Sequence, residues 1–311
     1  MDLDDLLLKT SRTFALAIPL LPEPTRAAVG VAYLLFRIAD TFEDATAWPR
    51  TQRIEALERF VEVLQLPSAQ QRAQAEKLVA WSFTTPPVEH AGYLELLQQT
   101  PAVLQHLTTL APRVREVILA HTVRTAEGMA QVVSRADERG NLQLTSTRDL
   151  QSYCYIVAGI VGELLTEVFL HDCASLADDA AKLRGHMLAF GEGLQLINIL
   201  KDAGDDARDG RVYLPRTVAR AEIFALASAD LDGGNQYVQA LQAGGAPRGY
   251  LAFCGLSLAL AFKALSTLEV QGSGAKVSRD DVGRLFEGLH HELDVGARLD
   301  LKALASRPHP A

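Results

Sequence analysis

Two stretches of the sequence combine an apolar helical pattern with an acidic end, and they constrain the fold more than any other feature. The first ends in Asp40-Thr-Phe-Glu-Asp44 and the second in Asp202-Ala-Gly-Asp-Asp206, with the same spacing between the outer aspartates. At about 100° per residue of helix, the four polar residues of each stretch share an arc of about 60° and about 80°, respectively. These residues are Tyr33, Arg37, Asp40 and Asp44 in the first stretch, and Gln195, Asn198, Asp202 and Asp206 in the second. Each predicted helix therefore presents one polar stripe that ends in two carboxylates.

The paired carboxylates predict a bound cation. Carboxylates one helical turn apart repel each other, and oxygen ligands without a His or Cys companion suit Mg²⁺. This ion prefers one or two carboxylates together with water and the oxygens of a phosphate-bearing substrate. Two facing stripes would form a clamp for Mg²⁺ and a diphosphate. The alternative is that each acidic run is a solvated helix end, but apolar residues lead directly into both clusters, so the polar stripes interrupt faces that must be buried.

The periodicity of the whole chain predicts an all-α protein. Apolar residues recur at intervals of three and four along most of the 311 residues, and alternating strand patterns are missing. Aromatic residues make up only 6% of the chain, whereas good helix formers such as Leu and Ala are plentiful. We predict roughly ten helices in one domain that spans residues 1–311.

Turn residues give the expected boundaries of these helices. The clearest helices are predicted over residues 25–45, 147–170, 177–201, 215–227, 247–270 and 278–304, and Pro24 suits the start of the first. Loops are predicted at 67–68, 84–87, 100–101 and 140–145. Glycines predict further breaks at 233–234, 244–245 and 272–274.

Charge and cysteine content exclude several classes of protein. The net charge is −8 and no basic block occurs, so a nucleic-acid partner is not expected. Cys154, Cys173 and Cys254 are widely spaced, which predicts neither a disulfide framework nor a zinc site. The first five residues include three aspartates, where a secretion signal would be basic. The longest uncharged apolar run, 250–262, is shorter than the roughly 20 residues needed to cross a bilayer. We expect a cytoplasmic protein with at most peripheral membrane contact.

Five ordered motifs together resemble the squalene and phytoene synthase family, the head-to-head prenyl transferases. They are Thr10-Ser-Arg-Thr-Phe14, residues 33–44, residues 153–162, residues 195–206 and Arg211-Val-Tyr-Leu-Pro215. The resemblance runs from about residue 6 to residue 215. It implies a single-domain class I isoprenoid synthase helical bundle with a central apolar cavity.

The resemblance also implies roles for individual residues. The Mg²⁺ ligands would be Asp40, Asp44, Asn198, Asp202 and Asp206. Substrate would be bound by Ser11, Arg12, Phe14, Arg37, Gln195, Asn198, Lys201 and Arg211. Tyr33 and Tyr153 would stand close to the reacting carbons. Lys201 occupies a position where the family commonly has Arg, so its contact with a diphosphate would be that of a point charge.

The implied activity is a Mg²⁺-dependent condensation of two prenyl diphosphates through a cyclopropylcarbinyl diphosphate, with release of pyrophosphate. Asp40-Thr-Phe-Glu-Asp44 resembles the squalene branch, which favours farnesyl diphosphate as substrate. The sequence Arg211-Val-Tyr-Leu-Pro215 resembles the corresponding motif of phytoene synthases. Geranylgeranyl diphosphate therefore stays open as the alternative substrate. NADPH is implied as a second cofactor where the product is squalene; proton loss or capture by water would give dehydrosqualene, phytoene or hydroxysqualene.

Other interpretations of these residues stay open. A class I terpene cyclase also ionises an allylic diphosphate, but it normally carries a hydroxyl residue and a Glu where this chain has Asp202 and Asp206. A non-catalytic helical assembly factor of the same fold would be expected to lose these aspartates. Tyr33 and Tyr153 also suit core positions, and Arg37 also suits an ion pair with Asp40. Gly159 and Gly162 would in either case permit close helix packing.

Overall fold

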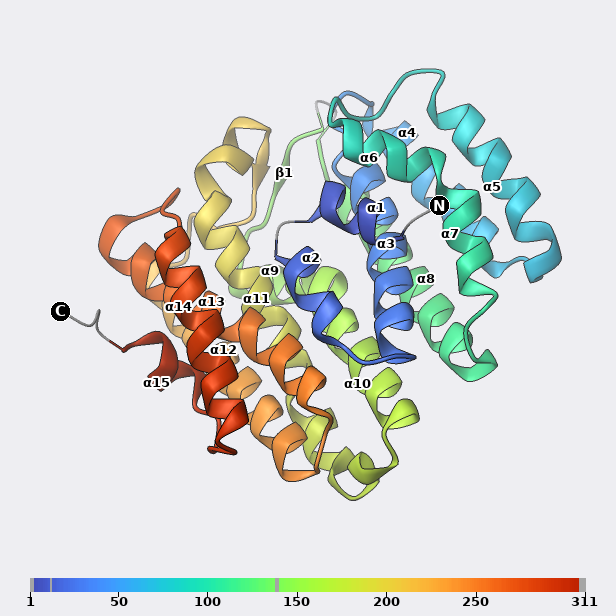
Figure 1. Ribbon diagram of the computed structural model, residues 1–311. Coiled ribbons are helices and arrows are strands. Elements are labelled where there is room, and N and C mark those ends of the chain that lie inside the picture. Colours follow the sequence, from blue (N-terminus) through green and yellow to red (C-terminus); the bar gives the residue numbers. More distant parts are fainter. Residues whose placement is uncertain (1–2, 12, 138–139, 308–311) are drawn as a thin grey trace. The chain divides into compact units, whose positions relative to one another are not determined.

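The structure, a computed structural model, describes residues 3–11, 13–137 and 140–307. Within these ranges it contains fifteen α-helices, three short 3-10 or π-helical segments and two strands of two residues each (Figure 1). The prediction of an all-α protein is confirmed, although the helices are more numerous than the sequence indicated.

The chain divides into two compact units. Unit 1 comprises Met1–Ile18 and Glu23–Leu142, and unit 2 comprises Pro19–Pro22 and Gln143–Ala311. The single domain and the central cavity expected from the sequence stay predictions.

Unit 1 is built around the first acid-ended helix. Its helices are α1 (Leu3–Thr10), α2 (Phe14–Ala17), α3 (Thr25–Glu43), α4 (Arg50–Gln65), α5 (Ser68–Ser82), α6 (Ala91–Gln98), α7 (Thr100–Leu107) and α8 (Pro112–Ser134). The 3-10 turn η1 (Ile18–Leu20) follows α2, and its last two residues are assigned to unit 2. Helix α3 packs against α1, α4, α6, α7 and α8. Leu34, Leu35 and Ile38 of α3 are completely buried, because apolar side chains occupy all of its faces except the polar stripe.

Unit 2 is built around the second acid-ended helix. Its helices are α9 (Thr147–Cys154), α10 (Ile160–Asp172), α11 (Ala180–Arg208), α12 (Arg220–Ala243), α13 (Arg248–Gln271), α14 (Arg279–Asp294) and α15 (Leu301–Ala305), with the π-helical η2 (Tyr155–Gly159) and the 3-10 helix η3 (Ala174–Asp179). The strands are β1 (Leu142–Gln143) and β2 (Arg211–Val212), and the N–H of Leu144 donates to the carbonyl of Val212. Helix α11 packs against η2, α10, α12 and α13.

Glycines bring the neighbours of α11 unusually close to it. A Cβ atom on Gly162 would lie 2.0 Å from the carbonyl oxygen of Met187, and one on Gly191 would lie 2.0 Å from that of Ala158. No real side chain tolerates such a distance, so both helix backbones touch at these positions. The close packing expected at Gly162 is therefore confirmed.

The break predicted at Gly233 and Gly234 is wrong, because both residues lie inside α12. A Cβ on Gly233 would lie 2.7 Å from the Cβ of Ala189 in α11, and one on Gly234 would lie 2.8 Å from Leu258 in α13. The pair serves helix packing, which outweighs the lower helix propensity of glycine.

Other boundaries also differ from the predictions. Helix α11 continues to Arg208, so Asp202 and Asp206 lie within the helix rather than beyond it, and the break comes at Gly210 with a φ of 79°. Thr100, predicted in a loop, starts α7, where a proline in the first turn is tolerated. The helix predicted over residues 278–304 is divided into α14 and α15 near Gly296, which has a φ of 67°.

Two helical stretches of the described residues are long and apolar enough to cross a membrane by composition. They are Thr147–Asp172 and Arg248–Gln271, with mean hydropathies of 1.6 and 1.8 over their best windows. The second exceeds the apolar run 250–262 read from the sequence, because Lys263 lies within the helix and does not end it. Of these windows, 61% and 72% are buried inside the protein, so core packing accounts for their apolar character as readily as a membrane does.

Candidate active site

The polar stripe of α3 forms a connected group, as its spacing predicted. A guanidinium nitrogen of Arg37 lies 3.2 Å from the carboxylate of Asp40, and Nε of Arg37 donates to the hydroxyl of Tyr33 at 3.4 Å. The Tyr33 hydroxyl donates in turn to the carbonyl of Thr10 at 2.8 Å. The ion pair considered for Arg37 and Asp40 is therefore present, and the role of the stripe in binding metal and diphosphate stays a prediction.

Arg37 also contacts a tyrosine that the sequence did not indicate. Its guanidinium carbon lies 5.6 Å from the ring centre of Tyr33 and 5.6 Å from that of Tyr93 in α6. Both distances suit cation–π attraction. Tyr93 lies far from α3 along the chain and belongs to no recognised motif, so only the packing of α6 against α3 reveals it.

The carboxyl group of Asp40 is electrostatically strained. Its pKa is raised to about 6, because burial and the charge of Asp44 raise it by more than the charge of Arg37 lowers it. Burial by itself would lower the pKa of Arg37, but the carboxylate of Asp40 together with Tyr33 and Tyr93 more than compensates, and the pKa of Arg37 is raised. Asp44 follows α3 directly and is exposed, with its N–H bonded to the carbonyl of Asp40 at 2.8 Å. A cation close to both carboxylates would relieve this repulsion.

The motif at residues 10–14 lies beside the same stripe. The hydroxyl of Ser11 accepts a hydrogen bond from the N–H of Phe14 at 2.9 Å, so it stabilises the start of α2. The rings of Phe14 and Tyr33 lie 5.5 Å apart. Arg12, predicted to bind a diphosphate, lies outside the described residues.

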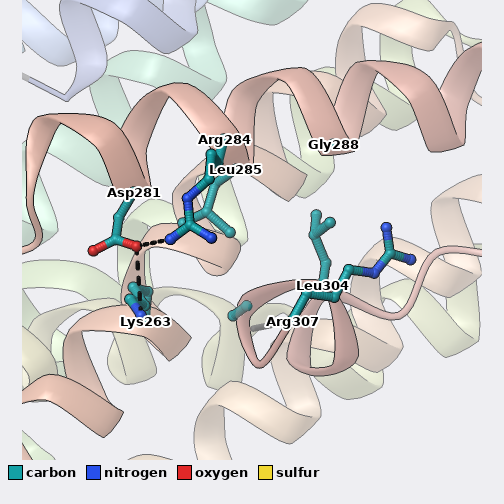
Figure 2. A pocket seen from close by; sticks show the side chains of 8 residues that line it. Lys263, Asp281, Arg284, Leu285, Gly288, Leu304 and Arg307 are labelled. Atoms are coloured by element: carbon teal, nitrogen blue, oxygen red, sulfur yellow. Dashed lines mark hydrogen bonds and ion pairs between the residues drawn. The ribbon is translucent and has the colours of Figure 1, made fainter. Parts of the chain in front are cut away.

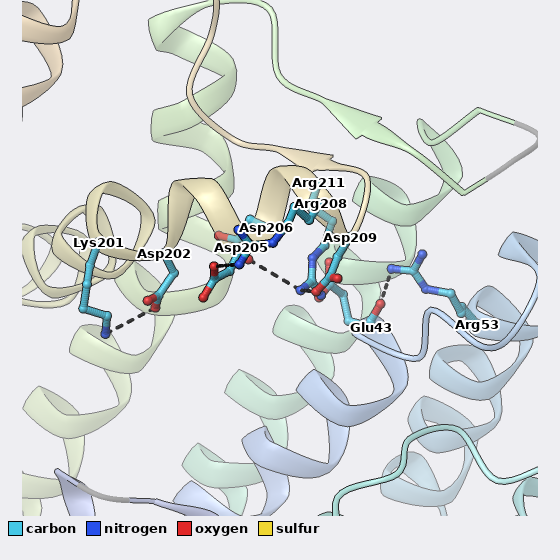
Figure 3. A network of polar contacts seen from close by, with 9 residues as sticks. All are labelled: Glu43, Arg53, Lys201, Asp202, Asp205, Asp206, Arg208, Asp209 and Arg211. Carbon is cyan, nitrogen blue, oxygen red and sulfur yellow. Dashed lines mark hydrogen bonds and ion pairs between the residues drawn. The ribbon is translucent and has the colours of Figure 1, made fainter. Parts of the chain in front are cut away.

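The polar stripe of α11 is also joined to a cation. Nζ of Lys201 lies 3.2 Å from the carboxylate of Asp202 (Figure 3). It also donates to the side-chain oxygen of Asn198 at 3.3 Å. The side chain of Asp202 is 47% exposed, so it is accessible to a ligand. Gln195 lies two turns earlier on the same face and is half-buried.

Arg211 links the end of this stripe to the loop after α11. Its guanidinium lies 3.5 Å from the carboxylate of Asp206 and 3.2 Å from that of Asp209 (Figure 3). Asp209 was not predicted; it follows the acidic cluster by three residues, which is the signal that would have indicated it. Asp205, in the same acidic cluster, pairs with the exposed Arg208 instead.

Tyr153 is buried by an aromatic stack. Its ring lies 4.5 Å from that of Tyr213, nearly parallel, and both residues are 6% exposed. Tyr213 belongs to the motif Arg211-Val-Tyr-Leu-Pro215, so two of the recognised motifs of unit 2 meet in this contact. The core position considered for Tyr153 is therefore confirmed.

The donor sets of α3 and α11 fit Mg²⁺ but not a metal that needs a complete protein cage. Each helix brings only two outer aspartates, and no group of three or more His, Cys, Asp or Glu side chains is gathered anywhere in the described part of the chain. Magnesium needs only one or two carboxylates when phosphate oxygens and water complete its shell. The nearby Arg37, Lys201 and Arg211 neutralise the carboxylates in this structure.

Two further carboxyl groups, not predicted from the sequence, lie on α11 and α12. Glu192 shares the polar face of α11 with Gln195 and Asp206, and Asp230 lies on α12, whose backbone at this residue would be 3.1 Å from a Cβ on Gly193. Neither carboxylate has a hydrogen bond or ion pair with another described residue. Burial, and then the charge of Asp230, raises the pKa of Glu192 to about 7, and burial raises the pKa of Asp230 to about 6.

Glu192→Gln is expected to stabilise the protein at alkaline pH. A carboxyl whose folded-state pKa lies above its ordinary value destabilises the fold as pH rises from about 4.5 to about 7, where it must lose its proton. After allowance for partial exposure, the variant should gain on the order of 1–2 kcal/mol at pH 8 and little at pH 5. Urea unfolding at both pH values measures the difference. The control is Glu287→Gln at an exposed position of α14, and equal gains for both variants would contradict the interpretation.

Comparison with known proteins shows that both polar stripes lie in the part of the chain that matches one protein family. The squalene/phytoene synthase family model matches residues 7–242. The squalene synthase of Yarrowia lipolytica is 32% identical over 210 residues, which are 67% of this chain and 43% of the relative. The squalene synthase of Saccharomyces cerevisiae is 31% identical over 218 residues, 69% of this chain and 45% of the relative. The chain thus spans less than half the length of these curated relatives.

The fold agrees with that of solved structures. The structure of TcSQS in complex with the ligand E5700 matches with a TM-score of 0.73 and 23% identity, over 97% of this chain and 95% of the other. The helical architecture predicted for an isoprenoid synthase is therefore confirmed. Since the family match includes the polar stripes of both α3 and α11, the chain belongs to the squalene/phytoene synthase family.

Proposed function

We propose that this protein joins two prenyl diphosphates head to head, through a cyclopropylcarbinyl diphosphate, and releases pyrophosphate. The observation that carries the proposal is the repeated arrangement of two aspartates one turn apart at the ends of α3 and α11, where Arg37 pairs with Asp40, Lys201 with Asp202 and Arg211 with Asp206. Both arrangements lie within the residues that match the family. The identity to squalene synthases over two thirds of the chain supports the same reaction.

The proposed substrate is farnesyl diphosphate, and the proposed product is squalene or a related C30 hydrocarbon. The relatives of Schizosaccharomyces pombe, Yarrowia lipolytica and Saccharomyces cerevisiae are squalene synthases, which favours the farnesyl group over the longer geranylgeranyl group. Phytoene synthesis from geranylgeranyl diphosphate is the second candidate, because the motif Arg211-Val-Tyr-Leu-Pro215 resembles that of phytoene synthases. NADPH is proposed as the hydride donor if the product is squalene. A class I cyclase and a non-catalytic assembly factor are the remaining alternatives.

The proposed role of the cationic side chains is to hold the diphosphate and the departing pyrophosphate. Bound Mg²⁺ supplies Lewis acidity that draws charge from the diphosphate of the allylic substrate. The ligands proposed for it are Asp40, Asp44, Asn198, Asp202 and Asp206. Arg37 and Arg211, which pair with aspartates in this structure, would turn toward phosphate oxygens, for which their planar donors are well shaped.

The aromatic side chains are proposed to protect the carbocation that forms when pyrophosphate leaves. Water would quench this cation, so the surrounding surface must be apolar. Phe14 with Tyr33, and Tyr153 with Tyr213, present paired rings beside the two polar stripes. Their π faces would attract a cation without reacting with it.

Arg37→Lys is expected to lower kcat/KM by about ten- to a hundredfold. Lysine keeps the charge, but a single ammonium group cannot reproduce the planar, multi-donor contact with phosphate oxygens or the position beside Tyr33 and Tyr93. Steady-state pyrophosphate release measures the effect. Arg59→Lys is the matched control, because Arg59 pairs with Glu55 and lies 4.7 Å from the ring of Trp81. Unchanged kinetics in Arg37→Lys would remove Arg37 from the site.

The proposed activity is tested by incubating the purified protein with Mg²⁺ and either farnesyl or geranylgeranyl diphosphate. Each reaction is run with and without NADPH, and the extracted lipids are identified by mass spectrometry. A C30 product from farnesyl diphosphate supports the proposal, and a C40 product would identify the phytoene reaction. Pyrophosphate release without either product would indicate a cyclase. No turnover of either substrate would favour the assembly factor.

The proposed location is cytoplasmic, with at most peripheral membrane contact for release of the lipid product. The burial of the most apolar windows of unit 2 supports a core role for these segments. Co-sedimentation of the protein with liposomes, with and without a high-salt wash, tests the membrane contact.

A further inference from the structure

Arg53 of α4 is a buried arginine whose position the proposed chemistry does not explain. It is 4% exposed, and its guanidinium donates to the main-chain carbonyl of Glu43, the last residue of α3 (Figure 3). Its Nε is buried and has no hydrogen-bond partner among the residues that the structure describes. Within the described ranges no carboxylate lies at ion-pair distance from Arg53. A buried cation without a carboxylate partner is costly, so another source of negative potential must compensate.

The C-terminus of α3 provides this negative potential. The last carbonyl groups of a helix have no partner within the helix, and the helix dipole places partial negative charge there. The same turn carries Asp40, Glu43 and Asp44, and Glu43 is itself 4% exposed. Carboxylates and carbonyl groups of one turn therefore repel each other, and a buried guanidinium on the neighbouring helix opposes this repulsion.

We propose that Arg53 is a positioning residue that holds the last turn of α3, so that Asp40 and Asp44 are ordered for a divalent cation bound to a diphosphate. The inference rests on the proposed function, because it assigns Arg53 to the same site. The carbonyl that Arg53 binds belongs to the residue directly before Asp44, and the N–H of Asp44 bonds to the carbonyl of Asp40 at 2.8 Å. Loss of the guanidinium releases this turn, and both carboxylates lose their fixed geometry.

Arg50 offers a matched comparison on the same helix. It also donates from its guanidinium to a main-chain carbonyl, that of Ala136, and it is partly buried. Ala136 follows α8 and lies outside the recognised motifs. Substitution of Arg50 therefore removes a similar guanidinium–carbonyl hydrogen bond from unit 1 without changing the contacts at the end of α3. The comparison distinguishes an effect on the position of Asp40 and Asp44 from a general loss of stability.

The test measures Mn²⁺ binding by electron paramagnetic resonance in the presence of inorganic pyrophosphate, for the full chain and the variants R53M, R53K, R50M and R50K. We expect Mn²⁺ to bind about tenfold more weakly to R53M and about threefold more weakly to R53K, because lysine restores the charge but not the reach. R50M and R50K should bind Mn²⁺ as the wild type does, even where their melting temperatures fall. Hydrogen exchange of a peptide covering residues 38–46 should rise in both Arg53 variants and in neither Arg50 variant.

The outcomes separate this inference from the proposed function. If the wild type binds no Mn²⁺ with pyrophosphate, the proposed function fails, and the inference fails with it. If the wild type binds and folded R53M binds equally well, the inference alone is wrong. If R53M does not fold, the R53K variant provides the test. Mn²⁺ affinity and hydrogen exchange of residues 38–46 that both equal those of the wild type in R53K would overturn the role of Arg53.

Discussion

Asp40→Ala and Asp202→Ala, each as a single change, are expected to lower product formation by at least about a thousandfold. Each aspartate belongs to one of the two proposed Mg²⁺ positions, and removal of a ligand from a metal-assisted reaction costs several kcal/mol of transition-state stabilisation. Both side chains are partly exposed, at 30% for Asp40 and 47% for Asp202, so packing losses should be small. The measurements are lipid product per unit time and the melting temperature, which should change by only a few degrees.

The matched control is Asp205→Ala. Asp205 lies in the same acidic cluster, but it is 74% exposed and pairs with the exposed Arg208. Its removal should leave turnover within about twofold of the wild type, since an exposed ion pair contributes little. Wild-type turnover in Asp40→Ala or Asp202→Ala would contradict the assigned ligand, whereas equal losses in all three variants would point to a general effect of charge.

The second large effect is expected at Gly162, where Gly162→Ala should destabilise the protein by about 3 kcal/mol or more. The added methyl group would lie 2.0 Å from the carbonyl oxygen of Met187, an atom of a helix backbone that cannot turn aside. Relief requires α10 and α11 to separate, which costs packing along their whole contact. Urea unfolding followed by circular dichroism measures the loss.

Gly185→Ala provides the control for this prediction. Gly185 lies on α11 as well, but no atom lies within 4 Å of the place its Cβ would take. Alanine there should stabilise the helix by up to about 1 kcal/mol, because glycine has the lower helix propensity. If Gly162→Ala proves as stable as Gly185→Ala, the close approach of the two helices is not present in solution.

The polar stripes illustrate how much of the site follows from local pattern. Tyr33, Arg37 and Asp40 were predicted to share one face by helical spacing, and the hydrogen bond and ion pair among them agree. Lys201 and Asp202 meet on α11 for the same reason. A helix has one fixed periodicity, so a sequence that specifies the helix also specifies which side chains share a face.

Contacts between different helices did not follow from local sequence pattern in this way. Tyr93, Tyr213 and Arg53 each touch a predicted site residue or its helix, and only Tyr213 lay within a recognised motif. A glycine in the sequence did not show by itself whether a helix ends there. Gly210 and Gly296 follow the ends of helices and have positive φ, whereas Gly233 and Gly234 lie inside α12. The same residue type permits a sharp turn or a close helix contact, and the sequence around it does not show which applies.

The sequence by itself therefore determined the helical class, the two polar stripes with their paired carboxylates, and the family to which they belong. These three properties depend on the spacing of residues along a single helix or on the order of the motifs along the chain. Only the tertiary structure decided which side chains surround those stripes, where α11 ends and that η2 departs from the α-helical pattern. It also decided that Arg53 is buried and that Glu192 and Asp230 are partly buried. Burial and contact depend on residues distant in the chain, and their energies arise only once the helices have packed together.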